Sequence, residues 1–134
     1  MQEIIAFLSQ NREGMLATVE NRKPRVRPFQ FQYLVNERLY FCTGRSKDVF
    51  RQIKENLAVE FSSMSGDMMR FVRVEGTVIM DDNRDVKEKI IAENPLVASI
   101  YRSADNPEFT TFCIEHGKAT LGSLTGDPSK RATF

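Results

Sequence analysis

Three strand-like segments lie within the first 43 residues, and only short turns separate them. They are Met15 to Val19, Arg25 to Val35 and Arg38 to Thr43, joined through Asn21 to Pro24 and through Asn36-Glu37. A parallel pair of strands needs a crossover of about a dozen residues or more, and neither turn is long enough for one. We therefore expect two successive antiparallel hairpins rather than a βαβ unit.

The middle segment indicates which side of these strands is buried. Phe29, Phe31, Tyr33 and Val35 alternate with Gln30, Gln32 and Leu34. Successive side chains of a strand point to opposite faces, so this order predicts one apolar face and one mostly polar face. The apolar face is expected to cover a core.

The rest of the chain alternates between helical and strand-like periods. Helices are predicted around Ile4, Ile5 and Leu8, from Val49 to Leu57 behind a possible Ser46 cap, over Asp85 to Glu93, and over Leu96 to Tyr101. Strands are predicted over Val59 to Ser63 and Phe71 to Met80, and a last hairpin over Phe109 to His116 and Lys118 to Leu124, turning at Gly117. The tail from Gly126 to Phe134 is expected to be loose. The sequence predicts a mainly β (α+β) fold, a small antiparallel barrel of six or seven strands with three or so flanking helices.

Composition limits the domain count and the partners. With 134 residues and 41% hydrophobic content, the chain is expected to form a single domain over residues 1–134. Nineteen basic residues against 18 acidic ones give a net charge of +1, which argues against nucleic acid or a membrane as partner. Two distant cysteines and no secretory signal pattern indicate the cytoplasm. One histidine and two separated cysteines are too few ligands for a tetrahedral metal site of nitrogen and sulfur, so no metal is expected, and an all-carboxylate site is the alternative.

The segment from Leu39 to Val49 is the most informative for function. A strand ends there in a short loop containing Gly44, and the loop opens directly into a helix. Backbone N–H groups at a helix start, the hydroxyls of Thr43 and Ser46 and the charge of Lys47 suit a phosphate group. The alternative is that Ser46 only caps the helix and Lys47 only faces solvent. The G-x-x-x-x-G-K-[ST] pattern of nucleoside triphosphatases is missing.

The segment from Lys23 to Phe31 is the second candidate. Arg25 and Arg27 lie two residues apart on one face of a strand, and Pro28 removes a backbone donor and leaves room for a flat ring. If this strand pairs with the one that ends at Thr43, Arg27 approaches the same phosphate. A basic edge strand protected against aggregation is the alternative. An oligonucleotide-binding barrel that uses the same basic and aromatic residues is a further one.

Other chemically active side chains have simpler explanations. Cys42 is predicted to be a packed thiol with no activating base nearby. His116 fits the end of a hairpin better than a proton donor. Arg73 and Glu75, on one face of a strand, indicate cross-strand ion pairing.

The order of motifs resembles the pyridoxamine 5′-phosphate oxidase-like family of FMN-binding split barrels, including its small nitroimidazole-resistance-like branch. The resemblance rests on a short N-terminal helix followed by Gly14-Met-Leu-Ala-Thr-Val19, Lys23-Pro-Arg-Val-Arg-Pro-Phe29, Leu39-Tyr-Phe-Cys-Thr43 with Ser46 and Lys47, Val72-Arg-Val-Glu-Gly76, Asn94-Pro-Leu-Val97 to Tyr101, and Glu115-His-Gly-Lys-Ala-Thr120. It runs along nearly the whole chain.

The resemblance implies a six-stranded antiparallel split β-barrel that forms a homodimer with FMN sites between the protomers. It implies that Arg27, Thr43, Ser46 and Lys47 hold the phosphate and that the backbone of Pro28, Phe29 and Gln30 lies along the isoalloxazine. Cys42, next to Thr43, is counted with these cofactor-binding residues.

On this basis we expect an FMN-dependent oxidoreductase that moves hydride between a nicotinamide donor and a small-molecule substrate. No catalytic side chain is assigned, because the flavin carries the electrons. A non-catalytic flavin carrier or sensor is the alternative, and the family also includes relatives that use haem or a deazaflavin, so the fold alone does not select the cofactor.

Overall fold

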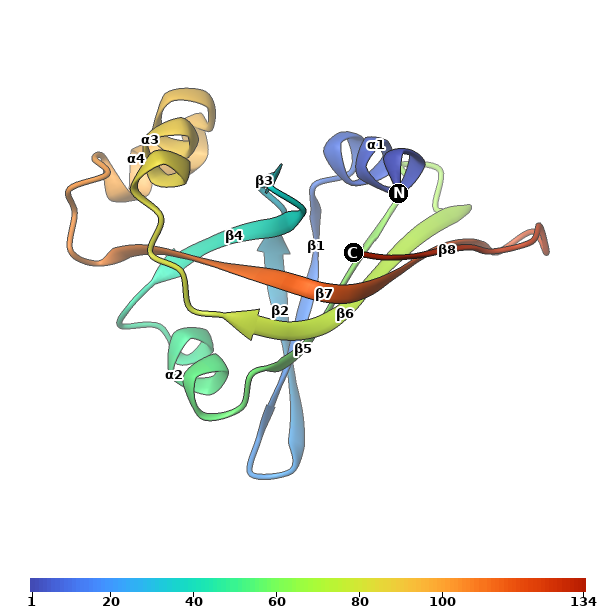
Figure 1. Ribbon diagram of the computed structural model, residues 1–134, viewed down its shortest axis with the longest axis horizontal. Helices are drawn as coiled ribbons and strands as arrows, with labels where there is room; N and C mark the ends of the chain where they lie inside the picture. Colours follow the sequence, from blue (N-terminus) through green and yellow to red (C-terminus); the bar gives the residue numbers. More distant parts are fainter.

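The structure, a computed structural model, describes all residues from 1 to 134 and contains four helices and eight strands (Figure 1). In chain order these are α1 (Gln2–Gln10), β1 (Glu13–Glu20), β2 (Lys23–Gln30), β3 (Tyr33–Val35), β4 (Arg38–Gly44), α2 (Asp48–Glu55), β5 (Ala58–Met64), β6 (Arg70–Ile79), α3 (Arg84–Glu93), α4 (Pro95–Tyr101), β7 (Phe109–Ser123) and β8 (Lys130–Thr133). No helix has both the length and the apolar content that a membrane crossing requires.

One antiparallel sheet holds all eight strands. Its order is β2-β1-β5-β6-β7-β4-β3, and β8 pairs with β7 beside this path. The two outer strands, β2 and β3, follow one another in the chain through Phe31 and Gln32. The Phe31 N–H donates to the carbonyl of Arg12 at 2.9 Å, and the Gln32 N–H donates to the carbonyl of Tyr40 at 3.0 Å. The sheet therefore closes on itself through a bent strand and forms a barrel.

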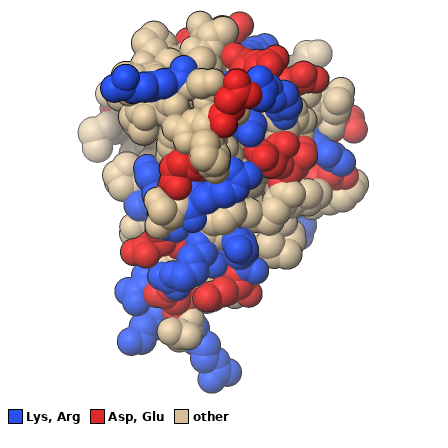
Figure 2. Space-filling view, turned by 90° about the vertical axis from the view of Figure 1, so that its left-hand side faces the viewer, with Lys and Arg blue, Asp and Glu red and all other residues tan.

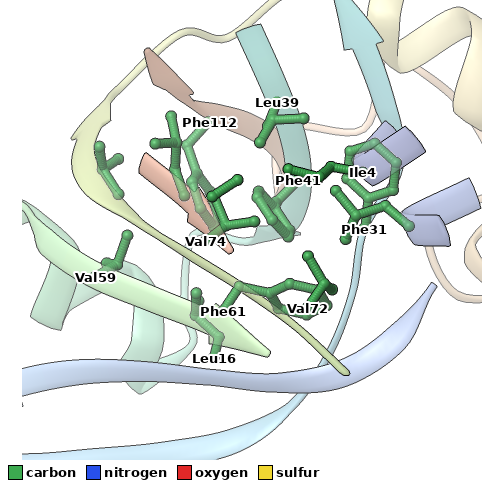
Figure 3. Packing of buried hydrophobic residues seen from close by; sticks show 14 of the residues in the cluster. Ile4, Leu16, Phe31, Leu39, Phe41, Val59, Phe61, Val72, Val74 and Phe112 are labelled. Atoms are coloured by element: carbon green, nitrogen blue, oxygen red, sulfur yellow. The ribbon is translucent and has the colours of Figure 1, made fainter. Parts of the chain in front are cut away.

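The barrel interior is filled by aromatic and branched side chains (Figure 3). The Phe41 ring on β4 stacks on Phe112 of β7 with centroids 5.5 Å apart, and it lies 5.2 Å from Phe61 of β5. Leu16 on β1 and Phe31 are also almost fully buried in this cluster. Burial of this apolar area is the main force that holds the barrel together.

A second, smaller cluster lies outside the barrel under α3 and α4. It contains Tyr40, Val86, Ile90, Val97, Tyr101, Phe109 and Cys113. Tyr33 and Val35 pack against this cluster, whereas Phe31 belongs to the barrel interior. The predicted apolar face of the middle segment is therefore buried at Phe31 and partly buried elsewhere, and the bend between β2 and β3 divides it between two cores. Gln32, on the predicted polar face, is also buried at 2% exposure.

The two hairpins predicted for the first half of the fold are confirmed, although the strand predicted from Arg25 to Val35 is divided into β2 and β3. β1 pairs with β2, and β3 pairs with β4, as the two successive hairpins. All four helices form at the predicted places, although α2 ends at Glu55 and leaves Leu57 outside. The antiparallel mainly β (α+β) class is also confirmed, with eight strands instead of six or seven and four flanking helices.

The predicted last hairpin is wrong. Phe109 to Ser123 is one continuous strand of 15 residues, and it does not turn back at Gly117. It bends there, with His116 at a φ of 57°, opposite an irregularity between Glu75 and Thr77 in β6. A Cβ at Gly117 would lie 2.6 Å from the carbonyl oxygen of Glu75, so the glycine serves a close approach of strands rather than a turn.

The predicted loose tail is wrong for its last part, where Lys130–Thr133 form β8. β8 pairs with residues Lys118 to Leu121 of β7, on the stretch of β7 that β4 does not cover. Ala132 and Phe134 pack against the barrel core. The apolar contacts and the free strand edge together hold this segment in place.

Candidate functional site

A groove of about 330 Å³ opens between the end of β2, the end of β4 and helix α4. Its lining residues are Glu13, Gly14, Pro28, Phe29, Gln30, Gln32, Cys42, Thr43, Lys47, Leu96, Val97, Ile100 and Tyr101. Six of the eight predicted site residues are among them: Pro28, Phe29, Gln30, Cys42, Thr43 and Lys47. The two segments singled out from the sequence therefore meet in space, although β2 pairs with β1 and not with β4.

Helix α4 forms the wall of the groove that sequence reasoning did not assign to the site. Asn94 holds this helix, because its side-chain oxygen accepts a hydrogen bond from the Val97 N–H at 3.3 Å. Its amide nitrogen donates to the side-chain oxygens of Gln30 at 2.8 Å and Gln32 at 3.1 Å. This bridge fixes α4 across the end of β2. The spacing of Leu96 and Ile100, four residues apart, was the available signal for an apolar helix face.

The end of β4 carries a buried hydroxyl without a partner. Thr43 is 3% exposed, and its Oγ1 makes no hydrogen bond. A buried hydroxyl without a hydrogen bond costs on the order of 1–3 kcal/mol. Such an atom in the wall of a groove is what a ligand with hydrogen-bonding groups would satisfy.

Gly44 allows β4 to end beneath α4. A Cβ at this position would lie 2.5 Å from Oε1 of Glu108 and 3.0 Å from the hydroxyl of Tyr101. The Tyr101 ring stacks on Phe109 with centroids 4.8 Å apart, and burial raises the pKa of Tyr101 to about 12. Tyr101 is therefore a neutral, fixed part of the groove at physiological pH.

Lys47 is the basic residue that lines the groove, and its charge is unpaired. It lies at the N-cap position of α2 with an exposed side chain, and it takes part in no ion pair. Lys47 also lines a neighbouring hollow together with Arg25, Val26, Arg27, Asp48, Val49 and Gln52. The lysine therefore lies where the two depressions meet.

Arg27 faces this neighbouring hollow rather than the groove. Its guanidinium donates to the carbonyl of Leu16 at 3.0 Å, to Oγ1 of Thr18 at 2.9 Å, and to the side-chain oxygen of Gln52. Burial lowers the pKa of Arg27, but an arginine remains charged at any physiological pH. Arg27 lines the hollow that shares Lys47 with the groove, and its position does not depend on pairing between β2 and β4.

Ser46 does not occupy the predicted position. Its backbone N–H and its hydroxyl both donate to Oε1 of Glu108, at 2.8 Å and 2.5 Å, and it lines neither depression. It also does not cap α2, because Lys47 is the N-cap residue and no side chain caps this helix. The hydrogen bonds from Ser46 lower the pKa of Glu108, so the carboxylate is charged at neutral pH and satisfies the donors that the sequence suggested for a phosphate.

The other chemically active side chains are two cysteines, the histidine and Arg73. Cys42 and Cys113 are free thiols, and burial raises their pKa to about 12 and about 11. His116 is exposed and lies 2.9 Å from Glu115, outside the groove. Arg73 pairs with Glu60 of the neighbouring strand at 2.6 Å, which confirms cross-strand ion pairing.

Charges of both signs cover the side of the molecule that carries α3 and α4 in Figure 1. Figure 2 shows basic and acidic side chains side by side over this face, with basic side chains gathered toward the lower end, where Figure 1 places the β1–β2 hairpin. A larger hollow of about 530 Å³ lies over β6, β7 and β8, and its lining is mostly charged or polar, with Ala119 and Ala132 as its apolar members. The groove beside α4 is the depression with a substantial apolar wall.

A closed antiparallel barrel, split by a bend between β2 and β3 and bearing a groove beneath an added helix pair, defines a split β-barrel protein. The family model described as pyridoxamine 5′-phosphate oxidase matches residues 1–121. The chain belongs to the pyridoxamine 5′-phosphate oxidase-like family.

Solved structures share this fold. A NimC/NimA family protein from Clostridium acetobutylicum is 30% identical, with 100% of this chain and 92% of that one covered at a TM-score of 0.88. General Stress Protein 26 from Bacillus anthracis is 21% identical, with 99% and 98% covered at a TM-score of 0.82. A pyridoxamine 5′-phosphate oxidase-related, FMN-binding protein from Nostoc punctiforme is 16% identical, with 96% and 84% covered at a TM-score of 0.69.

The same fold is described with other ligands. A haem-binding protein from Mycobacterium smegmatis is 13% identical, with 98% of this chain and 56% of that one covered at a TM-score of 0.77. An F420 reductase is 24% identical, with 81% and 89% covered at a TM-score of 0.62. No protein with a curated description matches the chain significantly.

Proposed function

We propose that the protein binds FMN in the groove beside α4 and acts as an oxidoreductase that moves hydride between a reduced nicotinamide and a small-molecule substrate. The observation that carries this proposal is the pairing of an apolar groove with two unsatisfied groups at one end, the buried Thr43 hydroxyl and the unpaired Lys47. These groups fit a ligand that is flat and apolar over most of its length and anionic at one end.

The residues divide into two groups on this proposal. Lys47 and the Thr43 hydroxyl hold the phosphate, with Arg27 contributing from the neighbouring hollow. The backbone from Pro28 to Gln30 lies along the ring, since Pro28 carries no N–H that would need a partner there. Ser46 does not bind the phosphate on this proposal, because its backbone N–H and its hydroxyl both donate to Glu108.

FMN, when bound, supplies the hydride chemistry. The protein's own contribution is to bind the phosphate, orient the ring and exclude water. Helix α4 excludes water on one side of the groove, through Val97 and Tyr101, which are buried beneath it. No side chain of the groove has to act as a nucleophile.

Homodimer formation belongs to the same proposal. The groove is at the small end of the range of about 300–1,000 Å³ that is typical of ligand sites, so a single protomer covers a ligand incompletely. Around it, Met15, Val26, Leu96 and Ile100 leave apolar side chains 51%, 67%, 64% and 56% exposed. A second copy of the chain over this surface would bury these side chains and close the groove.

The test begins with the absorption spectrum of the purified protein and a titration of the apo-protein with FMN. Flavin bands and saturable FMN binding are the expected results, whereas a Soret band would replace FMN with haem. Anaerobic stopped-flow reduction by NADH and NADPH then separates an oxidoreductase from a flavin carrier, because a carrier would be reduced slowly at every nicotinamide concentration. Light scattering gives the oligomeric state, and a monomer that binds FMN would contradict the dimer.

A further inference from the structure

Three polar side chains from three elements meet at the hollow that Lys47 also lines. Arg27 on β2 donates one hydrogen bond to Thr18 on β1 and another to Gln52 on α2. The Thr18 hydroxyl in turn donates to the side-chain oxygen of Gln52 at 2.6 Å. The two side chains that accept hydrogen bonds from Arg27 are therefore also hydrogen-bonded to one another.

The partners are buried and neutral. Thr18 is 1% exposed and Gln52 is 5% exposed, whereas Arg27 reaches the edge of the hollow that Lys47 also lines. A partly buried arginine often lies against an opposite charge, as a paired guanidinium and carboxylate do. Arg27 has a carbonyl, a hydroxyl and an amide instead.

Glu20 and Asp48 are the acidic groups near Arg27, and neither forms an ion pair with it. Glu20 pairs with Arg25 and Arg51, and Asp48 pairs with Arg51. A guanidinium has five N–H donors, and the contacts of Arg27 use three of them. Two N–H donors are left without a partner, on a guanidinium that lines the hollow and forms no direct ion pair.

We propose that Thr18 and Gln52 are positioning residues that fix the Arg27 guanidinium without neutralising it, so that its charge stays available to the phosphate of the cofactor. The inference rests on the proposed FMN site and adds two residues to it, neither of which lines the groove beside α4. The essential property of Gln52 is that its acceptor is an amide and not a carboxylate.

This property separates a positioning role from a purely structural one. Glutamate has nearly the shape of glutamine and would accept the same hydrogen bonds from Arg27 and Thr18. A structural role is therefore kept, or strengthened, in Gln52→Glu. The ion pair would, however, compensate the charge that the phosphate needs.

The experiment measures FMN and riboflavin binding by isothermal titration for the wild type, Gln52→Glu and the matched control Gln10→Glu. Gln10 is exposed at the end of α1 and lines none of the described depressions, so the control adds the same charge away from the site. We expect FMN affinity to fall at least about tenfold in Gln52→Glu. Riboflavin affinity should be unchanged in both variants, and the melting temperature should not fall.

Unchanged FMN affinity in folded Gln52→Glu, or equal losses for FMN and riboflavin, would overturn the inference and leave the FMN site intact. A wild type that binds FMN no better than riboflavin would instead overturn the phosphate site and this inference with it. If Gln52→Glu does not fold, Gln52→Met serves as the second variant. Loss of its acceptor should weaken FMN binding severalfold and spare riboflavin, and undiminished FMN affinity would again refute the proposal.

Discussion

Lys47→Ala is the most direct test of the groove, because this side chain is exposed, unpaired and shared by the two depressions. Its removal should leave folding nearly unchanged, within about 0.5 kcal/mol, since no contact is lost. A cation at a helix N-terminus opposes the helix dipole, so any change in stability should be a small gain. A charged hydrogen bond to phosphate contributes about 1.5–3 kcal/mol, and an exposed lysine belongs at the lower end. The expected loss of FMN affinity is therefore about tenfold.

The assay is isothermal titration of apo-protein with FMN and with riboflavin, together with thermal melting of the apo-protein. Riboflavin lacks the phosphate, so its affinity should be the same in the wild type and in Lys47→Ala. Lys54→Ala on the last turn of α2 removes the same charge from the same helix and should leave both affinities unchanged. Unaltered FMN binding in Lys47→Ala would refute the reasoning, and so would a parallel loss of riboflavin, which would assign Lys47 to the ring pocket or to the fold.

Further predictions concern three other places in the molecule. Arg27→Ala should weaken FMN binding but also lower stability by about 1 kcal/mol, because the guanidinium supports the buried Thr18 and Gln52, and thermal melting measures this loss. Glu108→Gln should lower the melting temperature at pH 7. Because Ser46 holds the pKa of Glu108 below its ordinary value of 4.5, this contribution is present above pH 4.5 and disappears as the pH falls below it, so melting temperatures of the two proteins should converge in acid. Cys42 and Cys113, with pKa values raised to about 12 and about 11, should react slowly with a chromogenic disulfide at pH 8 until the protein is unfolded, and Cys42→Ala should retain FMN binding close to the wild-type value.

Local sequence signals predicted the local parts of the fold. The turn at Asn21 to Pro24 and the turn at Asn36-Glu37 each join strands that pair with one another, so the information lies within a few residues. The same holds for α2, whose apolar period follows its own sequence. Many of the residues that line the groove could also be predicted, because the segments Lys23 to Phe31 and Leu39 to Val49 each have a distinctive sequence.

The errors arose where a residue's role depends on a distant partner. Gly117 has the local pattern of a turn, but the pairing of β7 with β6 on both sides of it keeps the strand continuous. Ser46 has the local pattern of a helix cap, but its donors bind Glu108, 62 residues further along the chain. The wall formed by α4 depends in the same way on a contact between Asn94 and Gln30 across 64 residues. Which partner each residue contacts depends on the whole folded chain, so it cannot be predicted from a short window of sequence.

The long β7 strand has a consequence for the order in which the chain can fold. β4, which carries Thr43, is held in the sheet by its neighbour β3 and by residues Phe109 to Ile114 of β7. The β1–β2, β3–β4 and β5–β6 pairs join strands that are near in sequence and can form early, whereas the closure of β4 on β7 requires a long chain loop to be brought together first. In refolding, the ability to bind a ligand in the groove should therefore appear after most of the hairpin structure, at the step in which β7 docks.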